Sequence, residues 1–439
     1  MKPGFYAIMS AQFFSSLADN ALLIAAIALL LQLDSPAWMT PLLKLFFVLS
    51  YVVLAAFVGA FADSRPKGKV MLMTNAIKLI GCLVMLFGFH PLAAYAIVGF
   101  GAAAYSPAKY GILTELLPPE KLVAANGWIE GLTVGSIILG TVLGGILINP
   151  SVAATLLSID LPVFDSHIDT PPEAAIAIIM VLYFIAALIN LKIPDTGVVY
   201  ENINKNPIKL VQNFAHCFKV LWSDRLGQIS LAVTTLFWGI GATLQFIILK
   251  WAESALQMDL SRSAILQAVV ALGVAGGAIW AAARVPLKNS LVVLKYGVIM
   301  GFFVITLAGF QQHQFGDYVI HFGFIHVPAH LLFIYIFLFI IGWMSGYFVV
   351  PMNALLQHRG HVLLSAGHSI AVQNLNENLS VLVMLGIYSL LISLNVPVQV
   401  VILCFGCFVI ISMALVIHWH KSNQKEYDSL HLIGEEKHH

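Results

Sequence analysis

Charged residues are scarce in this chain. Asp, Glu, Lys and Arg make up 10% of its 439 residues, whereas a soluble domain carries about 25%. Hydrophobic residues account for 60%, so too few polar residues remain to cover a water-soluble fold. This composition excludes a soluble enzyme with a single anchor and predicts a protein that crosses a membrane many times.

Other chemical signatures are also missing. The four cysteines, at positions 82, 217, 404 and 407, are too scattered to form a disulfide framework. The formal net charge of +1 leaves no basic groove for nucleic acid. We find no phosphate-binding glycine loop that ends in Lys-Ser or Lys-Thr, and no catalytic arrangement. The sequence therefore predicts a protein that is not an enzyme and that holds no metal or cofactor.

Apolar runs long enough to span a bilayer recur along the chain. A helix needs about 20 apolar residues to cross, so the hydrophobic residues suffice for about twelve helices. The pattern predicts an all-α polytopic membrane protein with two six-helix pseudo-repeats. The predicted helices cover 7–32, 38–62, 70–91, 93–116, 121–148, 173–193, 226–252, 262–284, 290–310, 331–356, 363–391 and 395–419.

The basic residues indicate how the chain lies in the membrane. With the N-terminus inside, most Lys and Arg residues fall in cytoplasmic loops or at cytoplasmic helix ends. An even number of helices then places both termini in the cytoplasm. A central linker at 194–225 separates a bundle at 1–193 from a second bundle at 226–420, and a cytoplasmic tail follows at 421–439. Transporters built from two parallel repeats have this arrangement.

A trace of the repeat survives in the residues. In the first half, SPAKYGIL at 106–113 leads to NGWIE at 126–130; in the second half, VPMNALL at 350–356 leads to QNLNE at 373–377. The two prolines and the two glutamates are separated by nearly the same number of residues. This spacing favours an internal repeat.

A basic loop, GAFADSRPKGK at 59–69, separates the second and third predicted helices. It resembles the cytoplasmic loop signature of the major facilitator superfamily, in which a glycine lets helices approach, an aspartate faces a helix N-terminus or a basic partner, and basic residues follow. An ordinary positive-inside loop would explain the cations alone. The matching residues are Gly59, Asp63, Arg65, Lys67 and Lys69.

A glycine-rich segment, GTVLGG at 140–145, resembles a second signature of the same superfamily. Small residues four apart let membrane helices pack closely. The segment therefore predicts helix packing rather than chemistry.

Polar side chains inside the predicted helices are the candidates for a substrate site. Each buried charge costs about 2.5–3.5 kcal/mol on insertion scales, so such residues are expected to serve a function. Carboxylates and Lys amines in one cavity would suit a headgroup that bears both an ammonium and a phosphate. They would equally suit internal ion pairs. The predicted substrate-binding residues are Asp19, Asn20, Lys109, Asn126, Glu130, Gln245, Lys250, Gln373 and Glu377.

The lysines differ in what their positions favour. Lys109 follows Pro107 near a helix end and is the better candidate for a phosphate contact. Lys78 is interpreted as a side chain that extends to the membrane surface. Lys250 is predicted to contribute to the cavity together with Gln245.

Four segments resemble the bacterial lysophospholipid transporter family, within the major facilitator superfamily: ADNALL at 18–23, GAAAYSPAKYGIL at 101–113, FVVPMNALLQ at 348–357 and IAVQNLNEN at 370–378. The resemblance implies a flippase in the bacterial inner membrane. Such a protein moves lysophospholipids, for example lysophosphatidylethanolamine, from the outer to the inner leaflet by alternating access. It also implies a functional link to an acyltransferase and acyl-carrier-protein synthetase that restore the diacyl lipid, a step of phospholipid remodelling.

Matching motifs within this resemblance favour Asp19, Asn20, Lys109, Asn126, Glu130 and Glu377 along the substrate path. One position departs from the pattern, because relatives can carry Arg where this chain has Gln245. The resemblance leaves open whether Lys250, more than a turn away, replaces that cation.

Two other functions fit the same residues. A proton-coupled exporter of small amphipathic compounds would share the fold, the glycine signature and the buried acids. A lipid-binding sensor or scaffold would bind lipid without moving it between leaflets.

Overall fold

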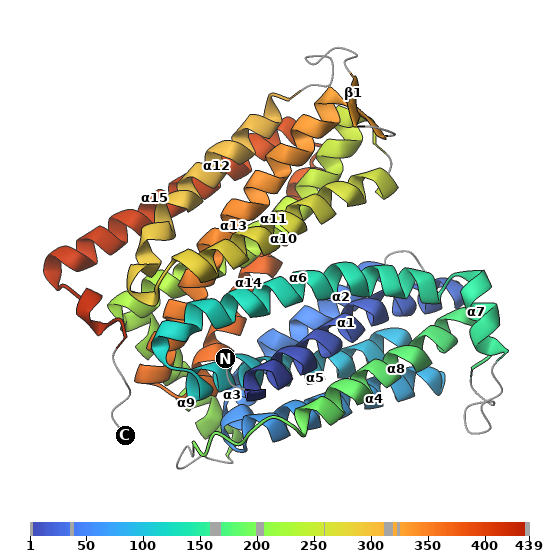
Figure 1. The fold of residues 1–439 in the computed structure, drawn as a ribbon, viewed down its shortest axis with the longest axis horizontal. Helices are drawn as coiled ribbons and strands as arrows, with labels where there is room; N and C mark the ends of the chain where they lie inside the picture. The colour runs from blue at the N-terminus through green and yellow to red at the C-terminus, as the bar shows by residue number, and fades with distance from the viewer. Residues whose placement is uncertain are drawn as a thin grey trace. The chain divides into compact units, whose positions relative to one another are not determined.

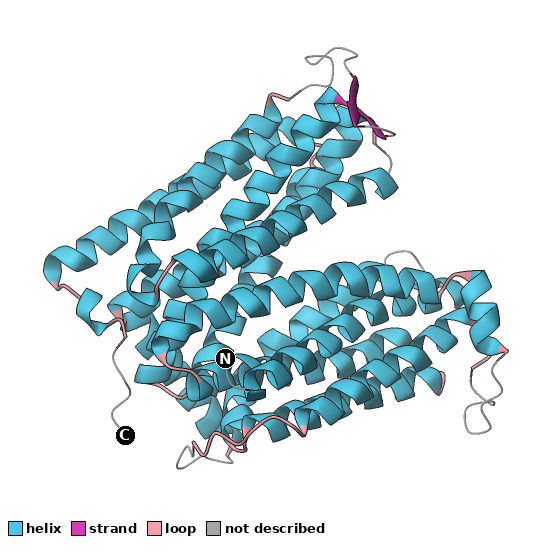
Figure 2. Cartoon of the chain, viewed as in Figure 1, coloured by secondary structure: helices cyan, strands magenta, loops and turns pink. Residues whose placement is uncertain are grey.

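The computed structural model describes residues 3–35, 39–158, 168–198, 206–258, 260–310, 319–322 and 325–434. Helices dominate this part of the chain (Figure 2). Ten of the described helices are long and apolar enough to cross a membrane, and the bent pair α2 and α3 would make an eleventh. Helix α5 (Pro91–Leu116), with 26 residues, also exceeds the length of about 20 that a span requires. The predicted all-α polytopic fold is confirmed.

The chain folds into two compact units. Unit 1 consists of Met1–Pro118, Gly135–Leu221 and Gly360–Leu375, and unit 2 of Pro119–Val134, Trp222–Arg359 and Asn376–His439. Helices α6 (Leu122–Leu147) and α14 (Ala366–Ser393) therefore contribute to both units. The domain division at 194–225 stays a prediction, since these units are defined by contacts and not by chain order.

Unit 1 is built around α1, which packs against α8, and around α4, which packs against α5 and α8 (Figure 1). Its core is made mainly of alanine, leucine and isoleucine side chains from these helices. Helix α8 starts at a capping box, in which Glu173 accepts from the backbone N–H of Thr170 at 3.0 Å. The helices of unit 1 include α1 (Pro3–Gln32), α2 (Met39–Val53), α3 (Ala55–Asp63), α4 (Lys67–Leu86), α7 (Pro150–Leu157), α8 (Pro171–Asn190) and α9 (Pro207–Ser223), whose last two residues belong to unit 2.

Unit 2 has its own apolar core. Bulky side chains from α10, α12, α13 and α15 form it, and α12 lies beside α15 (Figure 1). Its elements are α10 (Arg225–Leu256), α11 (Leu260–Arg284), the 3₁₀ segment η2 (Leu287–Val293), α12 (Leu294–Ala308), α13 (Ala329–Leu363), α15 (Val398–Glu426), and the strands β1 (Val319–Phe322) and β2 (Ile325–Pro328). Short 3₁₀ segments also occur at Pro119–Lys121 and Leu430–Leu432.

Three local features differ from the predicted helices. The predicted span 38–62 is broken at Leu54 into α2 and α3, which are bent by 66°. The short helix α7 and the amphipathic helix α9 lie in segments that were predicted as connections. Strands β1 and β2 pair antiparallel, with His321 opposite His326. Short or amphipathic elements escape a search for spanning runs, because their apolar residues are too few or lie on only one face.

The glycine segment at 140–145 packs as predicted. A β-carbon on Gly140 would lie 2.6 Å from the Leu17 carbonyl oxygen, and one on Gly144 would lie 2.9 Å from that of Ala21. Larger residues would therefore separate α6 from α1. This close contact brings α6 against the face of α1 that also carries Asn20.

Candidate functional site

A buried ion pair joins two membrane-spanning helices of unit 1. Lys78 Nζ on α4 donates to both carboxylate oxygens of Asp19 on α1, at 2.8 and 2.9 Å. The Lys78 side chain is 1% exposed and that of Asp19 is 21% exposed. Each charge offsets a burial cost that the other would otherwise leave uncompensated. The pair ties α1 to α4, and Asp19 is the member that a ligand can reach.

Neighbouring side chains hold the ion pair in place. The Tyr183 hydroxyl donates to Asp19 Oδ1 at 2.7 Å, and Ser15 Oγ accepts from Lys78 Nζ at 3.0 Å. The ring centroids of Tyr105 and Tyr183 lie 5.1 and 5.5 Å from the same amine. A cation within about 6 Å of an aromatic face is attracted to the ring. The amine is thus surrounded by acceptors and aromatic rings.

Two polar atoms beside the ion pair have no hydrogen-bond partner in the part of the chain that the structure describes. They are Asn75 Nδ2 and the Tyr105 hydroxyl. The amide oxygen of Asn75 accepts from Ser15 at 2.8 Å, so this side chain joins the same network. A buried polar group without a partner costs about 1–3 kcal/mol, a cost that an acceptor on a ligand would remove. We call the following six residues the ion-pair cluster: Ser15, Asp19, Asn75, Lys78, Tyr105 and Tyr183.

The predicted residues in and near the ion-pair cluster lie in different surroundings. Asp19 lies in the ion-pair cluster. It links α1 to α4 and is also a candidate site residue, because its side chain is partly exposed. The interpretation of Lys78 as a side chain that reaches the membrane surface is wrong, because its amine is buried on Asp19. Asn20 donates to the Ser16 carbonyl oxygen at 2.8 Å and packs against Gly140.

The basic loop forms a second buried cluster in unit 1. Asp63 accepts from Lys67, from the Ser365 hydroxyl and, at 2.9 Å, from the backbone N–H of Gly367. Gly367 lies in the first turn of α14, where the helix dipole stabilises an anion. His368 Nδ1 lies 2.9 Å from Asp63 Oδ2. The carboxylate therefore connects the end of α3 to the start of α14.

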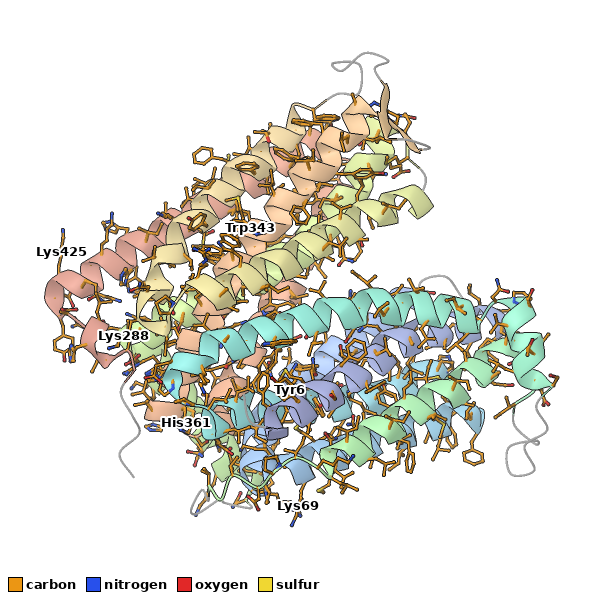
Figure 3. The ribbon with its side chains drawn as sticks, viewed as in Figure 1. Tyr6, Lys69, Lys288, Trp343, His361 and Lys425 are labelled. Carbon is orange, nitrogen blue, oxygen red and sulfur yellow. The ribbon has the colours of Figure 1, made fainter. Side chains whose placement is uncertain are left out.

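Two glycines allow this contact between α3 and α14. A β-carbon on Gly59 would lie 3.0 Å from the Gly367 carbonyl oxygen, and one on Gly367 would lie 2.6 Å from both Asp63 Oδ1 and the Gly59 carbonyl oxygen. The loop's other cations do not join the cluster: Arg65 lies over the Phe61 ring at 5.9 Å, and Lys69 is exposed and extends away from the ribbon (Figure 3).

The repeat segments supply a third set of contacts in unit 1. Asn374 on α14 donates to Ser106 Oγ on α5 at 3.0 Å, and Ser106 donates back to the amide oxygen at 3.3 Å. Gln373, the neighbour of Asn374, is 5% exposed. Lys109 lies one turn beyond Ser106, half-buried, with its amine 4.1 Å from the Tyr110 ring centroid.

The other two repeat segments, 126–130 and 350–356, come into contact in unit 2. Asn126 on α6 and Gln357 on α13 form two reciprocal amide hydrogen bonds, of 2.9 and 2.8 Å. One turn along both helices, Asn353 donates to Glu130 at 3.4 Å. All four side chains are buried. The residues predicted from the i, i+4 spacing thus share a helix face, and that face packs against polar residues of α13.

The remaining predicted residues also lie in unit 2. Glu377 is buried on α14, one turn beyond Gln373. Gln245 is exposed and donates to Gln267 at 2.8 Å. Lys250 is exposed and pairs with Glu253 at 2.8 Å, one turn along the same helix. Within the described residues, no group of three His, Cys, Asp or Glu side chains could hold a metal ion.

Comparison with known proteins places the chain in a family. The sequence model of the Major Facilitator Superfamily matches residues 8–384. The lysophospholipid transporter LplT of Yersinia enterocolitica is 42% identical over 90% of this chain and 89% of its own length. LplT of Yersinia pestis is also 42% identical, over 90% of this chain and 88% of the relative. The chain belongs to the major facilitator superfamily and to its lysophospholipid transporter family.

Solved structures of the superfamily share the fold. The transporter FucP superimposes with a TM-score of 0.70 at 12% identity, over 95% of this chain and 98% of FucP. At this identity the likeness concerns the fold alone.

Sequence reasoning missed several residues of this major facilitator protein. Asn75 and Tyr183 complete the ion-pair cluster, Asn353 and Gln357 face the α6 residues, and His368 contacts Asp63. One signal was available for two of them. Asn353 and Gln357 stand four residues apart, in or directly after the repeat segment 350–356, in the same way as Asn126 and Glu130.

Proposed function

We propose that this chain is a lysophospholipid flippase that moves lysophospholipids such as lysophosphatidylethanolamine from the outer to the inner leaflet by alternating access. The observation that carries the proposal is a buried ion pair, Asp19 with Lys78, in a chain 42% identical to proteins named as lysophospholipid transporters. The fold of the superfamily and the absence of a catalytic motif from the sequence favour a transporter over an enzyme.

The ion-pair cluster suits a zwitterionic headgroup. In the absence of substrate, Asp19 and Lys78 neutralise each other. A headgroup with an ammonium and a phosphate can exchange this pair for two new ones, in which Asp19 accepts from the ammonium and Lys78 donates to the phosphate. Each buried charge keeps a partner of opposite sign after the exchange, so the exchange avoids a large desolvation cost.

The unpaired donors of the cluster supply specificity. The Tyr105 hydroxyl and Asn75 Nδ2 would donate to phosphate or glycerol oxygens of the lysolipid. A site that hydrogen-bonds a substrate rejects analogues without the matching group, because its buried polar atoms are then left unpaired. Lys109, in the same helix as Tyr105, is the further candidate for a phosphate contact.

The amide contacts and the loop cluster would change between transport states. Asn126, Glu130, Gln373 and Glu377 are buried polar residues on helices that contribute to both units. Polar networks of this kind can exist in two discrete arrangements. Their proposed role is to line or gate the path, and Lys250 and Gln245 remain candidates for its outer part.

The distribution of basic residues supports an orientation with both termini in the cytoplasm, and the likeness to bacterial lysophospholipid transporters favours the inner membrane. Delivery to the inner leaflet would then present the lysolipid to a cytoplasmic acyltransferase and acyl-carrier-protein synthetase. The proposal thus places the protein in phospholipid remodelling.

The experiment uses spheroplasts that lack their own lysophospholipid transporter and retain an active acyltransferase. Labelled lysophosphatidylethanolamine is added outside, and its conversion to diacyl lipid is followed with and without this chain. We expect conversion that depends on the chain, and its loss in Asp19→Asn. The control is Glu120→Gln, which removes an exposed carboxylate. Normal conversion by a correctly inserted Asp19→Asn protein would refute the headgroup site.

A second candidate function rests on the same ion pair. A membrane-embedded carboxylate and amine can exchange protons during transport, as a proton-coupled exporter of small amphipathic compounds requires. Failure of the wild-type chain to move lysolipid, together with drug tolerance and proton movement linked to drug transport, would favour the exporter. Saturable lipid binding without leaflet exchange would instead favour a sensor.

A further inference from the structure

Unit 2 contains an apolar cavity of about 170 Å³ between α10, α14 and α15. Its inner wall is buried and is formed by Thr243, Ile247, Val401 and Phe405. Its rim is exposed and includes Ile387 and Cys404. The cavity is therefore a slot with an apolar floor that opens at the surface of unit 2.

The packing of α10 against α14 explains why the slot exists. A β-carbon on Gly239 would lie 2.7 Å from the sulfur of Met384 and would overlap Ser380 Oγ, so the two helices are in close contact there. One and two turns further along α10, Thr243 and Ile247 face α14 residues across the cavity. The two helices are thus in close contact at Gly239, and the cavity begins about one turn further along α10, at Thr243.

The chemistry of the lining excludes a headgroup. None of the described residues that line the cavity is charged. The two hydroxyls near it are already used, because Thr243 donates to the Gly239 carbonyl oxygen at 2.9 Å and Tyr388 donates to that of Phe246 at 3.3 Å. An occupant gains free energy here only by burying apolar surface, at about 0.8 kcal/mol for each methylene group.

The volume limits the size of that occupant. An engineered cavity of about 150 Å³ holds one benzene molecule, so 170 Å³ accommodates an apolar group of several carbons. A whole acyl chain is larger, but its end fits the floor while the rest leaves through the open rim. The exposed side chains at this rim, Ile387 and Phe408, are apolar as well.

The position of the slot along the helices fits a lipid that arrives from one leaflet. Leu391 lies near the end of α14 and Val401 near the start of α15. With both termini in the cytoplasm, this end of each helix lies on the outer side of the membrane. The slot would then be in the leaflet from which the proposed substrate comes.

We propose that this slot binds the end of the acyl chain of the lysophospholipid substrate. The proposal rests on the proposed function. A lysolipid has one chain, so a single slot that admits one chain end is sufficient. Transport efficiency therefore depends on chain length, and the dependence is set by α10, α14 and α15 rather than by the ion-pair cluster.

The first test is photo-crosslinking of the full chain in proteoliposomes. The probe is lysophosphatidylethanolamine with a diazirine at the end of its chain, and modified peptides are identified by mass spectrometry. We expect labels on α14 and α15 around Tyr388 and Cys404, and competition by unlabelled lysolipid. A diacyl phosphatidylethanolamine probe that labels these helices equally, without competition, would show that ordinary bilayer lipid fills the slot and would overturn the proposal.

The second test uses a matched pair of substitutions. Cys404 lines the slot, whereas Cys407 is exposed on the same helix and is not part of the lining. We expect Cys404→Trp to fill the slot and to lower kcat/KM for a sixteen-carbon lysolipid by about tenfold relative to an eight-carbon one, since fewer methylenes are buried. Cys407→Trp should leave this ratio unchanged.

The two failures can be told apart. If the wild-type chain moves no lysolipid of either length, the proposed function fails. If the wild-type chain moves both and Cys404→Trp leaves the chain-length ratio as it was, the slot does not hold the acyl chain. An equal change of the ratio in Cys407→Trp would also overturn the assignment.

Discussion

The two units differ in what they bury within their spanning helices. Unit 1 holds a full ion pair, Asp19 with Lys78, with hydroxyl and amide groups around it. Unit 2 also holds an ion pair, Arg359 with Asp224 at 2.7 Å, but this pair lies at the start of α10. The reciprocal contact of Asn126 with Gln357 uses neutral amides, and an apolar slot lies elsewhere in the same unit. The ion-pair cluster of unit 1 therefore offers charged partners to a ligand, whereas none of the described residues that line the slot of unit 2 is charged.

Lys78→Ala is expected to break this comparison most severely. Removal of the amine leaves Asp19 in the membrane interior without its cation, which costs about 3–5 kcal/mol. We expect a large loss of thermal stability in detergent and no transport. Lys192→Gln, at an exposed lysine, is the control and should retain the stability of the wild type.

The double variant Asp19→Asn with Lys78→Met separates stability from function. It removes both charges, so much of the thermal stability should return, whereas transport should not. Recovery of lysolipid transport in this variant would mean that the ion pair only holds α1 against α4.

Gly367→Ala tests the contact between α3 and α14. The new β-carbon would lie 2.6 Å from Asp63 Oδ1 and from the Gly59 carbonyl oxygen, so the helices must separate. We expect transport to fall by about tenfold or more, as for loss of a charge-assisted hydrogen bond of about 1.5–3 kcal/mol. Gly386→Ala lies on the same helix with nothing within 4 Å and should behave as the wild type. Equal transport by both variants would contradict the role of this cluster.

A double-mutant cycle of Asn126→Ala and Gln357→Ala measures the amide contact of unit 2. Neutral hydrogen bonds contribute about 0.5–1.5 kcal/mol each, so the coupling energy for unfolding should be far below that of the Asp19 and Lys78 pair. Equal coupling energies for the Asn126 and Gln357 cycle and for an Asp19 and Lys78 cycle would contradict the proposed difference between the units.

Tyr105→Phe is expected not to lower stability. Its buried hydroxyl is unpaired within the described structure, so its removal should raise the free energy of unfolding by up to about 1–3 kcal/mol. If the hydroxyl binds substrate, kcat/KM for lysolipid should still fall by about threefold to tenfold. Unchanged kinetics would remove Tyr105 from the proposed headgroup site.

The sequence predicts the spanning helices well because apolar length is a strong and local signal. The sequence also indicates Asp19, because a charge inside a spanning helix is unusual. It predicts that Asn126 and Glu130 share a helix face, since helical spacing determines which residues lie on the same side. The partners could not be predicted. Lys78 meets Asp19 only because α1 and α4 both pack against α5 and α8, and a single sequence does not specify which helices are neighbours. The break at Leu54 and the cavity near Gly239 likewise depend on how the helices pack in three dimensions.

The most direct test of the account measures lysolipid transport over two variables, the headgroup and the chain length, in Tyr105→Phe and Cys404→Trp. We expect Tyr105→Phe to lower kcat/KM by the same factor for lysolipids of both chain lengths. We expect Cys404→Trp to change the chain-length ratio and to leave the headgroup preference unchanged. A change of the chain-length ratio in Tyr105→Phe, or a change of headgroup preference in Cys404→Trp, would contradict the separate roles proposed for the ion-pair cluster and the slot.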